Sequence, residues 1–387
     1  MSLRHLTSID DLSLEEMGSI FSLAEKYVQK LAEPNIPYRV SKSTNACIGS
    51  ILATLFYEPS TRTRLSFESA MLRLGGQVIS SADPMASSAA KGEGLADTIR
   101  MASAYADVLV LRHPREGAAR FAAEYASVPV INAGDGAHEH PTQTLCDLFT
   151  ILRERGTLNS LTVALLGDLK GGRTAHSLAY ALARHGANIL LMPATGMEFP
   201  DHVASRLQDA FDYQYLEAGS LQGADDRITG AFVPKGATVR RFAAIDVLYV
   251  TRFQKERSTA TAPDYPKVNA AFLASQHFHN TLVLHPLPRV GELDPGFDQD
   301  ARAGYFRQAS YGVPVRMALI IFLLKGDAKG VGFEVGDGRT YDDVECGNAN
   351  CISRDAGEPA ASPKLELLPF DPPRLHCLYC DHEVPAA

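Results

Sequence analysis

Two arginines, one serine and two threonines lie close together in residues 56–65, FYEPSTRTRL. Residues 51–56 are apolar and β-prone, and apolar residues then recur at helical spacing, so the sequence predicts a strand, a turn and a helix. The first N–H groups and positive dipole end of such a helix favour an anion, and hydroxyl and guanidinium donors suit a tetrahedral phosphate. A lone Ser-Thr-Arg is usually only a helix cap, but two arginines alternating with hydroxyls beside Glu58 favour a phosphate site. Its donors are Ser60, Thr61, Arg62 and Thr63.

A second set of polar residues follows two later apolar runs. Arg112 comes directly after residues 107–111, at the carboxyl end of a predicted strand, where open α/β sheets bind ligands. His140 and Gln143 are three residues apart in a glycine-rich turn that runs into a helix, so they can face one point. Residues 138–140, His-Glu-His, could alternatively indicate a metal site. Because no further ligand follows at a useful spacing, hydrogen bonding is the better interpretation.

A third set lies in the second half of the chain. Residues 159–192 predict a strand, a glycine-rich turn, a helix and another strand, which is a βαβ unit. The glycines of the turn do not have the GxGxxG spacing, so a dinucleotide site is not favoured. Arg173 lies where the helix begins. Arg252 and Gln254 follow the apolar residues 247–251, and they point the same way if the chain stays extended.

Four of the six cysteines cluster at the end of the chain. After Gly326 the composition shifts to Gly, Asp, Pro and Ser, which predicts a linker and then a small module that can bury little apolar surface. The pairs Cys346-x4-Cys351 and Cys377-x2-Cys380 suit a tetrahedral zinc ion. Two disulfides are the alternative, which an intracellular setting disfavours. Four protein ligands leave no open position, so we expect a structural zinc and no organic cofactor.

The composition sets the class of protein. A length of 387 residues predicts two or three domains, and 45% hydrophobic with 21% charged residues is typical of a globular protein. The net charge of −8 argues against nonspecific binding of nucleic acid. No apolar segment is long enough to span a membrane, and the first residues lack a signal-peptide core, so we expect a cytoplasmic enzyme. Residues 12–31 have the apolar periodicity of an amphipathic helix.

Residues 56–76 resemble the carbamoyl-phosphate loop of the transcarbamoylase family. Further stretches narrow the resemblance to the aspartate carbamoyltransferases, over residues 3 to about 325; these are SSAAKGEGLADTIR, GDLKGGRTAHSL and TRFQKER. At residues 285–288 this chain has the sequence HPLP, whereas the corresponding motif of the ornithine enzymes resembles HCLP. The tail, with CGNANCIS and HCLYCDHEV, resembles the zinc-binding domain of the regulatory chain of these enzymes. We therefore expect a natural fusion of a catalytic chain with a regulatory-like zinc domain.

The resemblance implies a role for each motif. Carbamoyl phosphate would bind to Ser60, Thr61, Arg62, Thr63, Arg112, His140, Gln143, Pro286 and Leu287. The Leu287–Pro288 bond could be cis, because a rigid turn would aim backbone carbonyls at the carbamoyl nitrogen. Aspartate would bind to Ser87, Lys91, Arg173, Arg252 and Gln254. The residues expected to act in catalysis are Arg62, Thr63, Arg112, His140 and Lys91, the last reaching into a neighbouring subunit. Arg257 would pair with Glu58 in a closed state.

The expected fold is α/β, with two doubly wound parallel-sheet domains, a cleft between them, and a small β-rich zinc module at the C-terminus. The expected domains are residues 1–148 with a return helix 306–325, residues 149–305, a linker 326–340 and residues 341–387. Residues 219–238 look longer than the matching family stretch and are interpreted as an insertion of unknown purpose.

The expected reaction transfers the carbamoyl group of carbamoyl phosphate to L-aspartate, an early step of pyrimidine synthesis. The alternatives are a transcarbamoylase that uses another amino acid, such as ornithine, or an inactive scaffold that uses its zinc module to hold a protein or nucleic acid. The resemblance implies a homotrimer with shared active sites, and two trimers could join through the zinc modules. The stretch between Lys325 and Cys346 is too short for the nucleotide-binding domain of a regulatory chain, so control by nucleotides is not expected from this chain alone.

Overall fold

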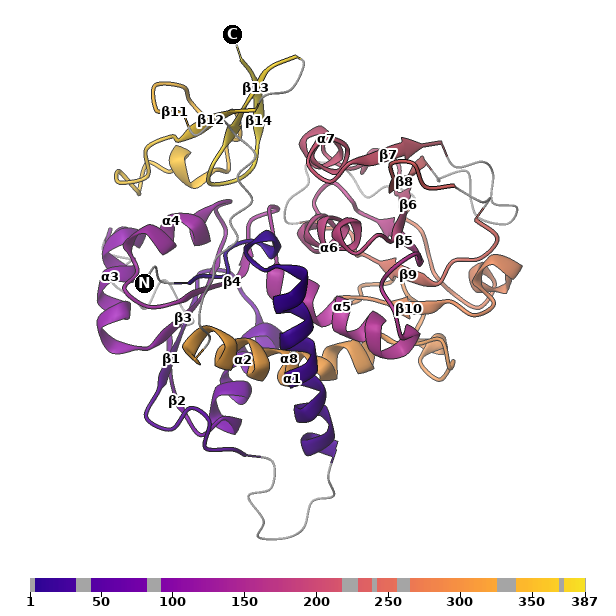
Figure 1. Ribbon diagram of the computed structural model, residues 1–387, viewed down its shortest axis with the longest axis horizontal. Coiled ribbons are helices and arrows are strands. Elements are labelled where there is room, and N and C mark those ends of the chain that lie inside the picture. Colours follow the sequence, from indigo (N-terminus) through magenta and orange to yellow (C-terminus); the bar gives the residue numbers. More distant parts are fainter. Residues whose placement is uncertain are drawn as a thin grey trace. The chain divides into compact units, whose positions relative to one another are not determined.

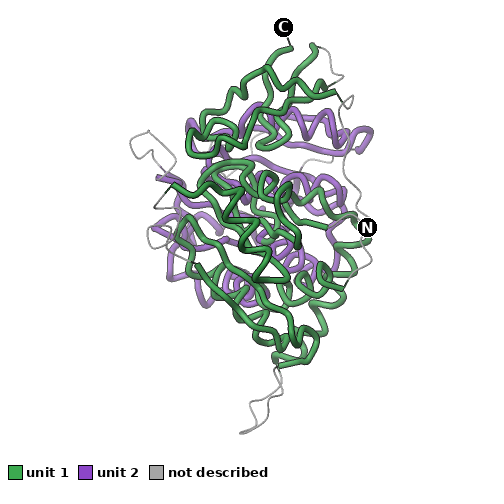
Figure 2. The backbone as a smooth tube through the Cα atoms, turned by 90° about the vertical axis from the view of Figure 1, so that its left-hand side faces the viewer, with its two compact units in different colours: residues 1–142, 312–387 green, residues 143–311 purple. Residues whose placement is uncertain are grey.

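A computed structural model describes residues 4–32, 43–81, 92–217, 229–238, 242–255, 265–325, 339–368 and 372–386 (Figure 1). The chain divides into two compact units, which Figure 2 colours separately. The first unit comprises residues 1–142 and 312–387, and the second comprises residues 143–311. Among the described residues, no helix has both the length and the apolar character needed to cross a membrane.

The first unit contains a parallel sheet of four strands in the order β2-β1-β3-β4. These strands are β1 (Ile51–Phe56), β2 (Gln77–Ser81), β3 (Val108–His113) and β4 (Val130–Asp135). The helices of this unit are α1 (Leu14–Ala32), α2 (Thr61–Arg73), α3 (Leu95–Tyr105) and α4 (Ala118–Tyr125), joined by the end of α8 (Tyr305–Lys325). The helix predicted from apolar periodicity is α1, whose buried residues include Met17, Ile20 and Phe21.

The second unit contains a sheet of six strands in the order β10-β9-β5-β6-β8-β7. The strands are β5 (Thr162–Gly167), β6 (Asn188–Pro193), β7 (Tyr213–Leu216), β8 (Gly230–Pro234), β9 (Val247–Val250) and β10 (Leu282–Leu284). Its helices are α5 (Pro141–Arg155), which begins at the boundary with the first unit, α6 (Arg173–Arg184), α7 (Asp201–Asp209) and the start of α8. β5, β6, β9 and β10 are parallel, as the predicted doubly wound sheet requires, and their residues are almost completely buried.

Strand β8 lies within residues 219–238, for which the sequence analysis predicts no secondary structure. Sequence alone assigns residues 219–238 to an insertion, but Gly230–Pro234 pairs antiparallel with both β6 and β7. The strand is short and nearly fully buried, so this part of the stretch belongs to the central sheet. No amphipathic alternation marks it, because both of its faces are covered.

The C-terminal module, defined as described residues 339–368 and 372–386, is the small β-rich element that the sequence predicts. Its antiparallel sheet has the order β11-β12-β13-β14. The strands are β11 (Thr340–Tyr341), β12 (Leu365–Leu368), β13 (Arg374–Cys377) and β14 (Glu383–Pro385). Its buried residues share one apolar cluster with α3, α4, β1 and β3, including Phe121 and Tyr379, whose rings lie 6.0 Å apart.

Candidate functional site

The sheet of the first unit has a topological switch point between β1 and β3. The chain leaves β1 for β2 on one side and later returns to β3 on the other side, and Phe56 is paired with Arg112 in the register. Open α/β sheets bind ligands outside the carboxyl ends of such strands. The loop after β1 and the end of β3 are therefore placed together at the position where a ligand is expected.

The predicted phosphate residues lie in this place. α2 begins at Thr61, and Ser60 is its N-cap residue with an extended backbone, but the Ser60 side chain makes no capping hydrogen bond. Instead its hydroxyl accepts a hydrogen bond from the Arg112 guanidinium at 3.3 Å. Thr61 and Arg62 are exposed, whereas Thr63 is buried. With no acidic side chain in its first turn, the helix N-terminus is suited to an anion from outside.

Arg112 is held by a carboxylate at the same strand end. Its Nε donates to Glu58 Oε2 at 3.1 Å, and the Arg112 side chain is only 14% exposed. This pairing orients the guanidinium beside Ser60. The family resemblance implies a pair of Glu58 with Arg257 in a closed state, and Arg257 lies outside the described residues. Among the described residues, Glu58 pairs with Arg112.

His140 lies in the loop between β4 and α5. It is 4% exposed, and its Nδ1 is 3.4 Å from the Thr142 hydroxyl. α5 begins at Pro141, directly after His140. The loop is tied down by Glu139, whose carboxylate accepts hydrogen bonds from the Ser8 hydroxyl at 2.5 Å and from the Ile9 N–H at 3.1 Å.

Gln143 is oriented by a residue that the sequence analysis missed, the fully buried Asp147. The Gln143 amide nitrogen donates to Asp147 Oδ1 at 2.7 Å, and Gln308 donates to the same oxygen at 2.6 Å. The Tyr249 hydroxyl donates to Asp147 Oδ2 at 2.9 Å. Burial and the Asp147 carboxylate raise the pKa of Tyr249 well above its ordinary value, so the phenol keeps its proton. Because a carboxylate only accepts, the Gln143 carbonyl oxygen is directed away from Asp147.

Asp147 leaves a recognisable signal in the sequence. It is a charged residue inside the apolar run LCDLFTIL and lies one helical turn after Gln143. The partners Tyr249 and Gln308 are more than 100 positions farther along the chain, so only the folded structure reveals them.

The sheet of the second unit has its own switch point between β5 and β9. Three residues predicted to bind aspartate come after these two strands. Arg173 begins α6, which follows β5, and Arg252 and Gln254 follow β9. Arg173 is 5% exposed. Arg252 and Gln254 are partly buried, and the Arg252 guanidinium donates to the Phe253 carbonyl at 3.0 Å.

Asp168, another residue that the sequence analysis did not single out, joins the two loops. One carboxylate oxygen accepts from the Gly171 N–H at 2.7 Å, and the other accepts from the Gln254 N–H at 3.0 Å. The side chain therefore fixes the turn before Arg173 against the backbone that carries Arg252. Its position directly after an apolar strand, in Gly-Asp, is the signal that could have marked it.

The HPLP turn follows β10. The Leu287–Pro288 bond, for which the sequence left both isomers open, is cis, and Leu287 has a positive φ of 56°. His285 Nδ1 accepts from the Leu287 N–H at 2.7 Å, and His285 Nε2 lies 2.6 Å from the Glu292 carboxylate. Because Nδ1 accepts, the ring donates through Nε2, and the buried pair fixes the backbone of Pro286 and Leu287.

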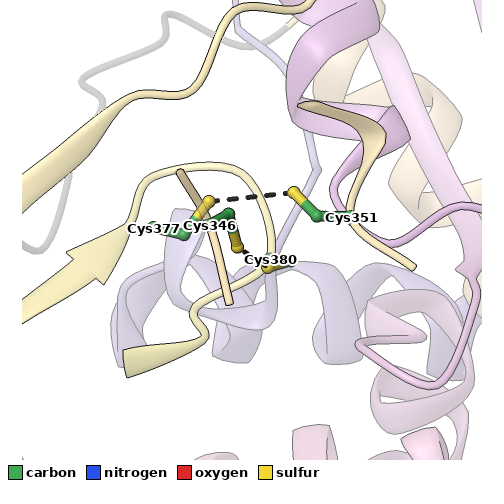
Figure 3. A group of neighbouring side chains, drawn as sticks. All are labelled: Cys346, Cys351, Cys377 and Cys380. Carbon is green, nitrogen blue, oxygen red and sulfur yellow. Dashed lines mark hydrogen bonds between the residues drawn. The ribbon is translucent and has the colours of Figure 1, made fainter. Parts of the chain in front are cut away.

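The four C-terminal cysteines converge as predicted (Figure 3). Their sulfur atoms all lie within 4.8 Å of one another, with 3.6 Å between Cys346 and Cys380 and 3.8 Å between Cys351 and Cys377. All four thiols are free and buried, so the disulfide alternative is wrong for this structure. Four convergent sulfur ligands are the donor set of a tetrahedral metal site.

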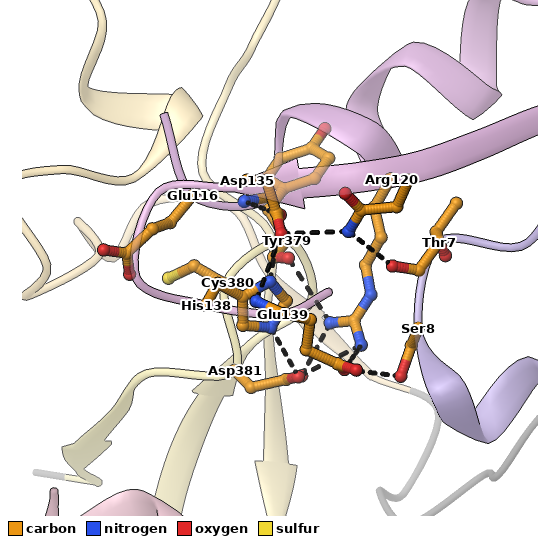
Figure 4. Close-up of polar contacts among 12 residues, drawn as sticks. Thr7, Ser8, Glu116, Arg120, Asp135, His138, Glu139, Tyr379, Cys380 and Asp381 are labelled. Atoms are coloured by element: carbon orange, nitrogen blue, oxygen red, sulfur yellow. Dashed lines mark hydrogen bonds and ion pairs between the residues drawn. The ribbon is translucent and has the colours of Figure 1, made fainter. Parts of the chain in front are cut away.

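A second group of possible metal ligands comprises His138, Glu139 and Asp381. His138 contributes to a hydrogen-bonded network in Figure 4. The Arg120 guanidinium donates to both oxygens of Asp381, at 2.6 and 3.0 Å, and lies 3.9 Å from Glu139. Because arginine already supplies the positive charge here, we interpret the group as an ion-pair network, in agreement with the hydrogen bonding preferred from sequence.

The remaining predicted residues, Ser87 and Lys91, lie outside the described residues. Among the others, the structure brings Ser60, Glu58 and Arg112 together at one strand end, and it joins the loops of Arg173 and Gln254 through Asp168.

Three family models match successive parts of the chain. Residues 4–154 match the carbamoyl-phosphate-binding domain of aspartate/ornithine carbamoyltransferase, and residues 159–323 match its aspartate/ornithine-binding domain. Residues 339–386 match the metal-binding domain of the aspartate carbamoyltransferase regulatory chain.

Individual proteins agree with this match. The chain is 45% identical over 327 residues to the aspartate carbamoyltransferase catalytic subunit of Clostridium botulinum (strain Langeland), covering 83% of this chain and 98% of the relative. Among solved structures, it is similar to the catalytic subunit of M. jannaschii aspartate transcarbamoylase, with 43% identity, a TM-score of 0.69, and coverage of 84% of this chain and 99% of the other. It is also similar to aspartate transcarbamoylase from Trypanosoma cruzi in complex with N-(phosphonacetyl)-L-aspartic acid, with 37% identity, a TM-score of 0.69, and coverage of 82% and 95%.

Proposed function

Because this chain belongs to the aspartate/ornithine carbamoyltransferase family, we propose that it transfers the carbamoyl group of carbamoyl phosphate to L-aspartate, giving N-carbamoyl-L-aspartate and phosphate. Such a reaction supplies a precursor for pyrimidine biosynthesis. The observation that carries the proposal is the placement of Ser60 and Arg112 beside the N-terminus of α2, at the switch point of the first sheet.

The phosphate group of the donor substrate would bind at this helix N-terminus. Ser60, Thr61, Arg62 and Thr63 would hold its oxygens through hydroxyl, guanidinium and backbone donors. Thr63, Arg112 and His140 would donate to the carbonyl oxygen, while Gln143, Pro286 and Leu287 would accept from the carbamoyl NH₂. The orientation of Gln143 by Asp147 supports this role, because its carbonyl oxygen is the atom directed away from the carboxylate.

The chemistry needs no covalent enzyme intermediate. The neutral amine of aspartate attacks the carbonyl carbon, its lone pair forms the C–N bond, and the carbonyl oxygen gains negative charge that the three donors stabilise. The bond from carbon to the phosphate oxygen then breaks, and its electron pair leaves with phosphate. A phosphate oxygen can accept the proton of the amine. The acceleration comes mainly from orientation and fixed donors.

The acceptor would be bound by Arg173, Arg252 and Gln254, together with Ser87 and Lys91 of a neighbouring subunit. A planar guanidinium can bind a carboxylate through two parallel hydrogen bonds, which suits the two carboxylates of aspartate. The HPLP sequence and the pair Arg252 and Gln254 favour aspartate over ornithine. The T. cruzi relative in complex with aspartate and phosphate supports this preference.

We assign the metal of the C-terminal module as a structural zinc. A zinc–sulfur bond of about 2.3 Å in a tetrahedron places neighbouring sulfur atoms about 3.8 Å apart, and two of the sulfur pairs lie 3.6 and 3.8 Å apart. Four cysteines would complete the coordination, so the metal would hold the module together and take no part in the reaction. No organic cofactor is required by the proposed chemistry.

We further propose a homotrimer with active sites shared between subunits, which higher assembly through the C-terminal modules could extend. The domain boundaries of the proposed enzyme are residues 1–148 with 306–325, residues 149–305, and residues 341–387 after a linker at 326–340.

The function is tested by incubating the purified full chain with carbamoyl phosphate and either L-aspartate or L-ornithine, and measuring the carbamoylated product by colour. The expected result is rapid formation of N-carbamoyl-L-aspartate, together with one zinc ion per chain by elemental analysis. If the chain carbamoylates ornithine in preference to aspartate, the acceptor is ornithine and the proposed acceptor is wrong. No product with either amino acid would leave the non-catalytic scaffold as the better explanation, and a salt-dependent gel shift would then test for nucleic acid.

A further inference from the structure

The C-terminal module contacts the loop that follows Arg112. The Glu116 N–H donates to the Asn350 carbonyl at 3.0 Å, and the Ile352 N–H donates to the Glu116 carbonyl at 2.9 Å. The Glu116 carboxylate also accepts from the side chains of Asn348 at 2.6 Å and Asn350 at 3.2 Å. Glu116 is therefore fixed through both its backbone and its side chain, four residues after Arg112.

A second contact holds the loop that carries His140. His138 Nε2 lies 2.9 Å from Asp381 of the module, and His138 Nδ1 lies 3.0 Å from Asp135 at the end of β4 (Figure 4). Burial lowers the pKa of His138, but the two carboxylates outweigh this and raise it well above its ordinary value, so both ring nitrogens donate. Asp381 is next to the metal ligand Cys380, and His138 is two residues before His140.

A third contact lies at the start of α3. The Glu358 carboxylate of the module accepts hydrogen bonds from the Leu95 N–H and from the Ala96 N–H, the latter at 3.4 Å. A carboxylate at a helix N-terminus is favourable because it satisfies free N–H groups and complements the helix dipole. Gly94 permits the approach, since a Cβ there would lie 3.0 Å from the carboxylate. This helix begins four residues after Lys91.

These three contacts have a common position in the sequence. The first lies four residues after Arg112 and the second lies two residues before His140, both of which are proposed to bind carbamoyl phosphate in the same chain. The third lies four residues after Lys91, which is proposed to act in a neighbouring subunit. A further contact shares this position, because Arg115, three residues after Arg112, donates to the Asp355 carboxylate of the module at 2.8 Å. Contacts of the module with the end of α4 do not. Lys364 pairs with Glu124 near the end of α4 at 2.8 Å, and this pair is well separated in sequence from each of those three residues.

We propose that the C-terminal module positions the carbamoyl-phosphate half of the active site in its own chain, with Asp381 acting through His138 on the loop that carries His140. The proposal rests on the proposed function and adds a catalytic consequence to a module otherwise assigned to folding and assembly. Donors to a developing oxyanion must be held in place before the reaction, and a displacement of about 1 Å can cost about a hundredfold in rate. His138 and Asp381 are positioning residues, because they reach the substrate only through the loop.

The test compares variants at two contacts of the same module. His138→Gln keeps a polar side chain but can no longer donate to both carboxylates. Asn348→Asp places a carboxylate against that of Glu116 at the partly exposed edge of the module, where folding is less affected. Lys364→Met is the matched control, because it removes an ion pair to the module away from the three loops.

Steady-state rates are measured for the full zinc-loaded chain while each substrate is varied separately. For His138→Gln and Asn348→Asp we expect kcat to fall about tenfold, with the KM for aspartate changed less than twofold. For Lys364→Met we expect kcat within twofold of the parent. Zinc content and sedimentation mass should be the same for all four proteins.

Hydrogen exchange gives a second readout that does not depend on activity. We expect peptides covering residues 136–144 to exchange faster in His138→Gln, and those covering residues 113–118 to exchange faster in Asn348→Asp, with neither changed in Lys364→Met. Equal losses of kcat in all three variants would overturn the proposal, because they would show a general effect of weakened docking. An unchanged kcat in both test variants would also overturn it. If the parent chain forms no product, the proposed function is wrong. The positioning role is then tested by hydrogen exchange alone, and it is rejected if residues 136–144 and 113–118 exchange at the parent's rate in the two test variants.

Discussion

Asp147 accepts a hydrogen bond from the side-chain amide of Gln143 at 2.7 Å, and this contact orients the amide so that its carbonyl oxygen is directed away from the carboxylate. Asp147→Asn replaces the carboxylate with a group of the same shape that can present a donor to Gln143. We expect kcat/KM for carbamoyl phosphate to fall by about ten- to a hundredfold, since the Gln143 carbonyl oxygen would no longer be held in place. Tyr249→Phe removes only the hydroxyl that donates to the other Asp147 oxygen and serves as the control. Similar kinetics for the parent and Asp147→Asn would contradict the assigned role of Gln143.

A second prediction concerns the proposed phosphate site at the N-terminus of α2. Arg62→Ala should lower kcat/KM for carbamoyl phosphate by about a hundredfold or more, because it removes a charged donor from the phosphate and the leaving group. Arg64→Ala is the matched control on the same helix, since Arg64 lies 3.7 Å from Glu68 in a pair one turn apart. Pairs of that kind contribute little to stability, so the control should keep near-normal rates. Equal rates for the two variants would show that the helix N-terminus does not bind the phosphate.

Much of this arrangement could be predicted from sequence, and the limits have physical causes. Buried parallel strands appear as apolar runs, so β1, β3, β5 and β9 were recognisable, and the polar residues after them were predicted to be ligands. The four cysteines carry their own spacing signal. Strand β8 was missed because five residues in a polar stretch have no distinctive period. The roles of Asp147 and Asp168 depend on partners distant in sequence, which local patterns cannot reveal. The contact of His138 with Asp381, 243 positions away, is of the same kind.

The aspartate half of the site should depend on Asp168. Asp168→Asn converts one acceptor oxygen into a donor, so the carboxamide cannot accept from both the Gly171 and the Gln254 N–H groups. We expect the KM for aspartate to rise about tenfold while the KM for carbamoyl phosphate stays within about twofold. Asp246→Asn is the control, because Asp246 accepts from the Thr162 N–H at the opposite ends of β5 and β9. A rise in the KM for aspartate in both variants would point to a general loosening of the second sheet.

The stability of the first unit should depend on the ionisation of His113. Burial lowers the pKa of His113 from its ordinary 6.5 to about 4, and its Nδ1 accepts a hydrogen bond from the Arg115 N–H at 3.1 Å. The charged groups around the ring are Asp355, Asp135, Arg115 and Glu58. Because the folded-state pKa is the lower one, the unfolded chain binds more protons between pH 6.5 and pH 4, and stability is lost as the pH falls through this window.

This effect is measured as the midpoint of thermal unfolding at pH values from 7.5 to 4, for the parent and for His113→Gln. His185, whose pKa burial likewise lowers to about 4, is present in both proteins and cancels in the comparison. Across the window we expect the free energy of unfolding of the parent to fall by on the order of 2 kcal/mol more than that of the variant, which appears as a larger drop in the midpoint. The expected difference is moderate because the His113 ring is only partly shielded from water. The two curves should run parallel above pH 7, where the ring is neutral in both states. Parallel curves over the whole range would show that His113 titrates alike in the folded and unfolded chains.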